Sequence, residues 1–149
     1  MGDETEELAE AMLAVSRAFI AIAAQSVAEL MPDLTLPQYR VLVVLATQGS
    51  QNLNALAAAL GVTASTASRL CDRLVRKKVI HRQTSRTDRR EIRLKITDSG
   101  REIYEEVIAR RRALIAPLVA AVPESSRKDL LAALRAISEA SGPSPATAV

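Results

Sequence analysis

Apolar residues recur at helical spacing along most of the chain. Between Glu4 and Leu30 they lie three, four or seven positions apart with one gap, which predicts a long amphipathic helix. Thr35 can cap a second helix that carries Pro37 in its first turn, and the apolar stretch after it stops at Gly49.

Two shorter helices are predicted next. Residues 53–60 form an apolar helix that Gly61 can end in the left-handed conformation. Thr63 is a good N-cap for the following helix, over about residues 63–78. We expect its inward stripe to be Ala67, Leu70, Leu74 and Cys71. Two short helices joined by about four residues that include a glycine form a helix-turn-helix.

The pattern then changes to strict alternation. Ile80, Arg82 and Thr84 alternate with polar residues, and so do Ile92, Leu94 and Ile96, which predicts a β-hairpin with "SRTDRR" near its tip. We expect an apolar face packed on the helices and a basic outer face. A hairpin directly after a helix-turn-helix is a wing.

Helical spacing returns in the last third of the chain. Thr97 caps a helix that Pro117 should kink or end, and Pro123 begins a last one. The predicted fold is mainly α with a small β wing, a winged helix-turn-helix between N- and C-terminal helical arms. The expected parts are the first arm, the winged lobe, the second arm and a flexible tail, over residues 1–34, 35–97, 98–140 and 141–149.

Composition and charge limit the classes of function that the chain can have. The 149 residues suit one domain, and the single cysteine excludes an internal disulfide. No apolar run reaches the roughly 18 to 20 residues that span a bilayer, and the acidic start is no signal peptide, so we expect a cytoplasmic protein. Residues 61–97 carry eleven Lys/Arg and three acids, a net +8, whereas the whole chain is only +3. This segregation indicates a polyanion partner, unless the block is simply a solvated basic face.

The basic block predicts a DNA interface with two parts. The recognition helix would present small hydroxyls and guanidinium groups to the major groove: Thr63, Ser65, Thr66, Ser68, Arg69 and Arg73. Serine and threonine near a helix start can also act only as caps. The wing would reach phosphates or the minor groove with Arg82, Arg86, Asp88, Arg89 and Arg90. We expect Asp88 to pair with Arg90 and hold its side chain outward.

The chain resembles the MarR (multiple-antibiotic-resistance regulator) family of winged-helix transcription factors. The resemblance rests on "LTLPQYRVLVVL", "LNALAAALGVTASTASRLCDRLVRKKVIHR", "DRREIRLKITDSG" and "LLAALRAI". It implies an intertwined homodimer, in which the N- and C-terminal helical arms are dimerisation arms and residues 35–97 are the DNA-binding lobe. The dimer would bind a near-palindromic operator with half-sites about ten base pairs apart. It also implies repression, released by a small aromatic or phenolic ligand or an oxidant. The family commonly has glycine where Lys78 stands. A left-handed lysine costs about 1 kcal/mol, so we expect this helix to end differently.

Other residues have more than one interpretation. Phe19, Tyr39 and Arg40 could line a ligand pocket, although core packing also explains the two aromatics. Cys71 could be a small core residue or a thiol whose pKa is lowered by Arg69 and Arg73.

The sequence gives little support for an enzyme. It shows no nucleophile–base pair near His81, no phosphate-cradling glycine loop and no metal cluster, so we expect no cofactor. The alternative to a DNA-binding regulator is a winged-helix module that binds an acidic protein partner. Salt dependence on duplex DNA discriminates between them.

Overall fold

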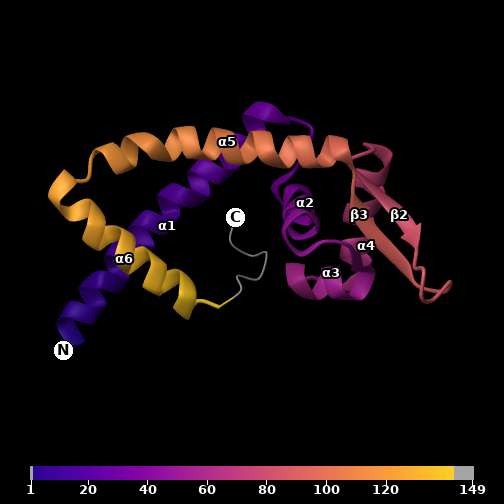
Figure 1. The fold of residues 1–149 in the computed structure, drawn as a ribbon, viewed down its shortest axis with the longest axis horizontal. Coiled ribbons are helices and arrows are strands. Elements are labelled where there is room, and N and C mark those ends of the chain that lie inside the picture. The colour runs from indigo at the N-terminus through magenta and orange to yellow at the C-terminus, as the bar shows by residue number, and fades with distance from the viewer. Residues whose placement is uncertain (1, 143–149) are drawn as a thin grey trace.

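The structure, a computed structural model, describes residues 2–142. The elements in order are α1 (Gly2–Leu30), α2 (Leu36–Gln48), β1 (Gln51–Asn52), α3 (Leu53–Leu60), α4 (Ala64–Arg76), β2 (Ile80–Thr84), β3 (Ile92–Ile96), α5 (Asp98–Ala120) and α6 (Glu124–Ala140). The helices from α2 to α4 and the hairpin gather at one end of α5, while α1 and α6 extend away from them (Figure 1). The predicted fold class is confirmed. The predicted tail lies almost wholly outside the described residues.

Three threonines start helices as the sequence predicts. Thr35 and Gln38 form a capping box: the Thr35 hydroxyl accepts from the Gln38 N–H, and the Gln38 side chain accepts from the Thr35 N–H. Thr63 caps α4 and Thr97 caps α5, each accepting from a backbone N–H three residues on. Local sequence therefore sets where the helices of the lobe begin.

The sheet has one strand that the sequence pattern does not predict. Its order is β1-β3-β2 and all pairs are antiparallel, with Gln51 opposite Leu94 and Ile80 opposite Ile96. β1 has only two residues, too few for an alternating pattern to be recognised. The strand attaches the start of α3 to the base of the wing.

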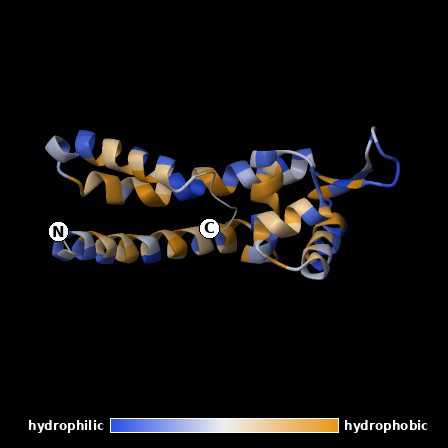
Figure 2. Cartoon of the chain, turned by 90° about the horizontal axis from the view of Figure 1, so that it is seen from below, coloured by the Kyte–Doolittle hydropathy of each residue, from blue (hydrophilic) through white to orange (hydrophobic). Residues whose placement is uncertain are grey.

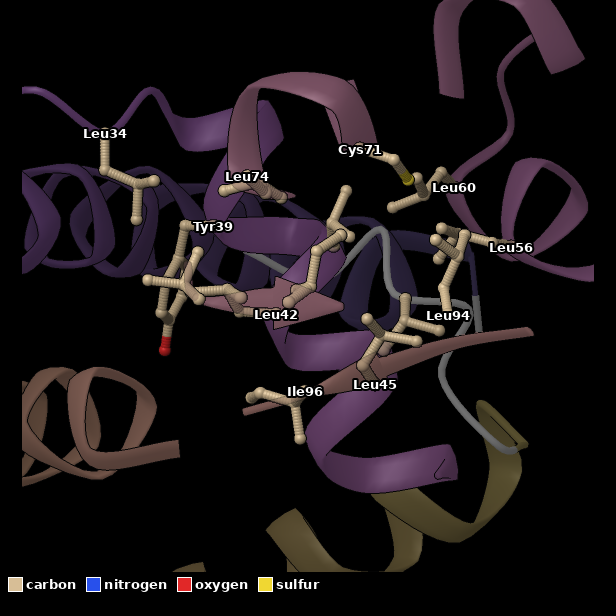
Figure 3. Close-up of a cluster of buried hydrophobic side chains, with 14 of the residues drawn as sticks. Leu34, Tyr39, Leu42, Leu45, Leu56, Leu60, Cys71, Leu74, Leu94 and Ile96 are labelled. Atoms are coloured by element: carbon tan, nitrogen blue, oxygen red, sulfur yellow. The ribbon is translucent and has the colours of Figure 1, made fainter. Parts of the chain in front are cut away.

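The apolar core lies inside the lobe (Figure 3). It includes Tyr39, Leu42, Leu45, Leu56, Leu60, Cys71, Leu74, Leu94 and Ile96. Of the four residues expected to face inward from α4, Ala67, Cys71 and Leu74 are buried and Leu70 is half-buried. On the wing, however, Ile92 is 56% exposed, so the expected apolar face ends before the hairpin tip.

The junction between the wing and α5 is tightly packed. The Thr97 hydroxyl donates to the Lys78 carbonyl at 2.8 Å and accepts from the Gly100 N–H at 3.1 Å. A Cβ on Gly100 would lie only 2.1 Å from the Val79 carbonyl oxygen. Glycine is therefore required here by close approach, which brings the first turn of α5 directly against the chain that leaves α4.

Of the two outcomes expected at Pro117, an end of the helix is wrong: α5 continues to Ala120, because the carbonyl that loses its partner to proline lies in an exposed turn. The expectation that no apolar run is long enough to span a bilayer is wrong as well. Helix α1 contains an 18-residue window with a mean hydropathy of 1.6, long and apolar enough to cross a membrane by length and composition. Only 17% of that window is buried. Figure 2 shows long hydrophobic stretches on α1, α5 and α6 beside hydrophilic ones.

Candidate nucleic-acid interface

The first turn of α4 divides the predicted base-contacting residues into two groups. The Thr63 hydroxyl accepts from the Thr66 N–H at 3.2 Å and donates to the Thr66 hydroxyl at 3.0 Å. Both side chains are therefore engaged in capping the helix, as the simpler interpretation of these residues requires.

The remaining predicted residues form an outward face. Ser65, Arg69 and Arg73 are exposed and follow one another at intervals of four residues, so they lie on one side of α4. Ser68 is half-buried. The exposed face combines a small hydroxyl with two guanidinium groups, which are groups that bind base edges and phosphates.

The end of α4 differs from the expectation. Lys78 has φ 61°, the left-handed conformation that glycine usually takes. The Lys78 N–H donates to the Val75 carbonyl at 3.0 Å and the Val79 N–H to the Leu74 carbonyl at 3.2 Å, the pattern of a Schellman motif. Val79 and Leu74 are both buried. These bonds and this burial offset the cost of left-handed lysine, so the helix ends as it would with glycine.

Two side chains of the wing loop stabilise its conformation through hydrogen bonds to the loop backbone. The buried Ser85 hydroxyl accepts from the N–H groups of Thr87 and Asp88 at 3.3 and 3.4 Å. Asp88 Oδ1 accepts from the backbone N–H of Arg90 at 2.9 Å. The expected pair between the Asp88 carboxylate and the Arg90 guanidinium is therefore wrong: Asp88 shapes the turn instead.

Three arginines remain available at the wing tip. Arg86, Arg89 and Arg90 are exposed, and within residues 2–142 none of them forms an ion pair. Figure 2 shows this loop as hydrophilic and projecting from the lobe. Like charges held this close repel one another. A bound anion such as a phosphate would relieve this repulsion, so the tip favours anion binding.

Arg82 does not behave as the other wing cations do. Its guanidinium forms an ion pair with the Asp72 carboxylate of α4. The prediction that Arg82 offers its charge to DNA is not supported by this geometry, because Asp72 already neutralises it. The pair instead links β2 to the recognition helix.

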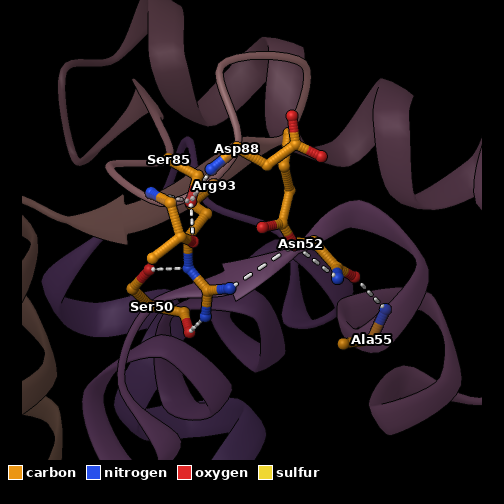
Figure 4. A network of polar contacts seen from close by, with 8 residues as sticks. Ser50, Asn52, Ala55, Ser85, Asp88 and Arg93 are labelled. Carbon is orange, nitrogen blue, oxygen red and sulfur yellow. Dashed lines mark hydrogen bonds and ion pairs between the residues drawn. The ribbon is translucent and has the colours of Figure 1, made fainter.

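A second network holds the base of the wing (Figure 4). Arg93 Nε donates to the Ser50 hydroxyl at 2.8 Å, and its Nη2 donates to the Ser50 carbonyl at 2.6 Å. Glu91 lies 3.5 Å from Arg93 and accepts from the Asn52 amide at 3.0 Å. The Asn52 side chain also accepts from the Ala55 N–H at 2.8 Å, which caps α3. Arg93 therefore positions the wing against the helix-turn-helix.

Cys71 has the environment of a core residue. It is fully buried, and burial raises the pKa of its thiol to about 11, although the nearby Arg82 opposes this shift. The alternative of a pKa lowered by Arg69 and Arg73 is wrong. His81 is half-buried, and the described residues hold no cluster of three or more metal-ligating side chains.

The three predicted pocket residues lie in different environments. Phe19 is 36% exposed on α1, whereas Tyr39 is buried in the lobe core and its hydroxyl has no hydrogen-bond partner in the described part of the chain. Arg40 donates to the Leu60 carbonyl at 3.0 Å. Core packing therefore explains Tyr39, and none of the three residues lines the cleft between α2 and α4.

That cleft lies between the start of α2 and the end of α4. It has a volume of about 360 Å³ and is lined by Asp33, Thr35, Gln38, Arg73, Arg76 and Lys77. Sequence reasoning missed it because its two halves are far apart in the chain and no local pattern marks their contact.

Comparison with known proteins agrees with this architecture. The sequence profile of the MarR family matches residues 34–92, from the start of α2 to the wing. The chain is also 39% identical to RV1404 from Mycobacterium tuberculosis, whose crystal structure superposes with a TM-score of 0.82 over 92% of this chain and 94% of that one. The chain belongs to the MarR family.

The names of two further relatives bear on function. The chain is 37% identical over 83 residues to the HTH-type transcriptional repressor MdtR of Bacillus subtilis, a match over 56% of this chain and 54% of MdtR. It thus spans about half the length of the curated relatives it matches. A mutant of Staphylococcus aureus MepR bound to an oligodeoxyribonucleotide is 26% identical, with a TM-score of 0.67 over 89% of this chain and 96% of that one.

Proposed function

We propose that this MarR-family chain is a cytoplasmic, homodimeric regulator that binds a near-palindromic DNA site and represses transcription until a small ligand releases it. The proposal rests on one observation, that two exposed surfaces suited to DNA lie next to each other on the same lobe. Ser65, Arg69 and Arg73 face outward from α4, and the unpaired arginines of the wing tip project beside them. The first surface suits the major groove and the second suits phosphates or the adjacent minor groove.

The arms support the homodimer. Within residues 2–142, every large apolar side chain that is exposed lies on α1, α5 or α6, with Ile92 the exception. No residue of α6 is buried. Isolated helices with such stripes bury them against another helix, and a two-fold partner offers the same stripes. The apolar window of α1 then packs against protein rather than lipid.

The relatives support the regulatory role. MdtR is named a transcriptional repressor, and the MepR mutant was crystallised on an oligodeoxyribonucleotide. Two recognition helices in a two-fold dimer would read half-sites about ten base pairs apart on one face of the duplex.

Salt dependence and sequence selection test DNA binding together. Selection of bound fragments from random duplex DNA should enrich one near-palindromic sequence. Affinity for it should fall steeply with salt, with a log–log slope of about −0.9 for each phosphate neutralised. A flat salt response, or no enrichment over random DNA, would instead favour an acidic protein partner.

A charged substitution on α6 tests whether the chain forms a dimer. Leu134→Glu places a carboxylate in the exposed apolar stripe of α6, where Leu134 is 49% exposed in the single chain. We expect a monomer in analytical ultracentrifugation and loss of binding to the two-half-site duplex. Ala136→Glu adds the same charge to the opposite side of α6 and should remain dimeric. A wild-type protein that sediments as a monomer contradicts the proposal.

A further inference from the structure

Glu91 is an acid in the most basic part of the chain. It follows Arg89 and Arg90 of the wing tip, and it is one of three acids in residues 61–97, which carry eleven Lys/Arg. A carboxylate beside a surface that suits phosphates opposes the approach of DNA, because like charges repel. The position of Glu91 therefore calls for a role inside the protein, which its contacts supply.

The backbone of Glu91 closes the loop that forms the wing tip. Its carbonyl accepts from the Ser85 N–H at 2.8 Å, and its own N–H donates to the Asp88 carbonyl at 3.1 Å. The first bond joins the two ends of the loop, and the second closes a turn whose central residues are Arg89 and Arg90. The place of Glu91 therefore sets the point from which the tip arginines project.

The side chain of Glu91 holds the start of α3. Its Oε1 accepts from the Asn52 amide at 3.0 Å, and the Asn52 Oδ1 accepts in turn from the Ala55 N–H at 2.8 Å (Figure 4). Because the Asn52 oxygen caps the helix, its nitrogen is the end that faces the carboxylate. Arg93 completes the group, with Nη1 3.5 Å from Glu91 Oε1 and with two further bonds to Ser50. One carboxylate thus connects the wing tip to the first helix of the helix-turn-helix.

Side chains hold the wing at two places besides the two residue pairs of β1 and β3. The ion pair of Arg82 with Asp72 joins β2 to α4, and the bond between Glu91 and Asn52 joins the loop before β3 to α3. A single connection lets a hairpin swing about it, whereas connections to two different helices favour one direction. The Glu91 and Arg93 side chains are 30% and 37% exposed, so their ion pair contributes little stability. Position is therefore the larger effect of this group.

We propose that Glu91 and Asn52 are positioning residues that set the distance between the wing tip and α4, and that they thereby decide how strictly the wing selects the base pairs flanking each half-site. This statement rests on the proposed function, in which α4 reads the major groove and the wing enters the adjacent minor groove. A wing held at one distance inserts well only where the groove has the right width at that distance, and groove width depends on sequence. A loose wing keeps its charge but loses this selection.

Asn52→Asp is the decisive variant. Aspartate caps a helix about as well as asparagine, so α3 keeps its cap, but the donor to Glu91 is replaced by a carboxylate that repels it. We expect hydrogen exchange of the DNA-free protein to become about tenfold faster in the wing tip, because a hydrogen bond to a charged group is lost, and to stay unchanged in α2. In selection from random duplex DNA, the flanking positions of each half-site should lose their preference while the central positions keep theirs.

Two further variants separate position from charge. Asn54→Asp adds the same charge at an exposed site two residues further along the chain, so it should leave wing exchange and flanking preference as in the wild type. Asn52→Asp combined with Glu91→Gln restores the bond with donor and acceptor exchanged and keeps the net charge of the wild type. In this double variant both readouts should return to within about threefold of the wild type.

Wing exchange that Asn52→Asp leaves unchanged, or that the double variant does not restore, overturns the proposal. So does a faster wing exchange with an unchanged flanking preference, or a loss of preference that is equal at central and flanking positions. Each of these results leaves the proposed function standing, because the wild type still binds a selected sequence. A wild type that binds no DNA overturns the proposed function and the flanking selection with it, whereas hydrogen exchange still decides whether Glu91 and Asn52 position the wing.

Discussion

Arg82 of the first wing strand and Asp72 of α4 form an ion pair that joins the two parts of the proposed DNA-reading surface. The two side chains are 42% and 49% exposed. A surface pair of this kind contributes about 0.2–1 kcal/mol to stability. We expect its greater effect to be geometric, because it links β2 to α4 and so favours one direction of the wing.

Asp72→Asn should therefore change specificity more than stability. The substitution frees the Arg82 guanidinium and adds one positive charge to the surface. We expect tighter binding to random DNA and a smaller preference for the selected site, measured by competition between the two duplexes. An unchanged preference would show that the pair does not position the wing.

Arg90→Ala should weaken DNA binding strongly. The Arg90 guanidinium is exposed at the ordered wing tip, and its removal should reduce the salt slope by about 0.9 if it neutralises one phosphate. Fluorescence anisotropy over a range of salt concentrations measures both effects. Lys128→Ala removes one charge from α6 and serves as the control, with no expected change in slope.

Arg69→Ala should alter which sequence is preferred. Arg69 is exposed on the face of α4 that we assign to the major groove, where an arginine–base pair contributes about 1–3 kcal/mol of discrimination. Selection from random DNA with the variant should relax one position in each half-site. A uniform loss of affinity with the same preferred sequence would assign Arg69 to a phosphate instead.

Alkaline pH should destabilise the lobe through Cys71. Burial raises the pKa of the folded thiol from 9.0 to about 11, so between these values the unfolded chain ionises first and binds fewer protons. Stability therefore falls as pH rises through this window, by at most about 3 kcal/mol. Urea unfolding from pH 8 to 11 should show a shallower decline in Cys71→Ala. Rapid labelling of the native thiol at pH 8 would contradict this burial.

Tyr39→Phe should stabilise the protein slightly. The Tyr39 hydroxyl is buried without a hydrogen bond of good geometry in the described residues. Burial raises its pKa to about 12, although the nearby Arg111 guanidinium opposes this shift. Removal of an unsatisfied hydroxyl at constant ring shape should raise the free energy of unfolding by about 1 kcal/mol. A loss of stability in urea unfolding would show that the hydroxyl has an acceptor in solution.

Local signals predict much of this fold. Threonine caps, Gly61 and the alternation in the wing all act within a few residues of the chain, so they can be read directly from the sequence. Lys78 is the instructive exception. The sequence predicts that the helix reaches about residue 78 and that Lys78 avoids the left-handed conformation, whereas α4 ends at Arg76 and Lys78 is left-handed. The Schellman bonds and the burial of Val79 that stabilise this lysine depend on the folded core.

Long-range contacts account for the incorrect predictions about the site. The arginines near the wing look equivalent in sequence, yet Arg82 meets Asp72 and Arg93 meets Ser50, 43 positions away. The cleft likewise needs Gln38 and Arg76 to come together. Charge counts could identify a basic lobe, but they could not show which cations were already paired.

The absence of a side chain at Gly100 has a consequence for the proposed dimer. Because α5 starts in direct contact with the Val79 carbonyl, no flexible linker separates α5 from the winged-helix lobe. In the proposed dimer, each winged-helix lobe would then move with its own α5 as one rigid unit. The distance between the two lobes, and hence the spacing of the half-sites they could reach, would be set by the angle at which the two α5 helices cross.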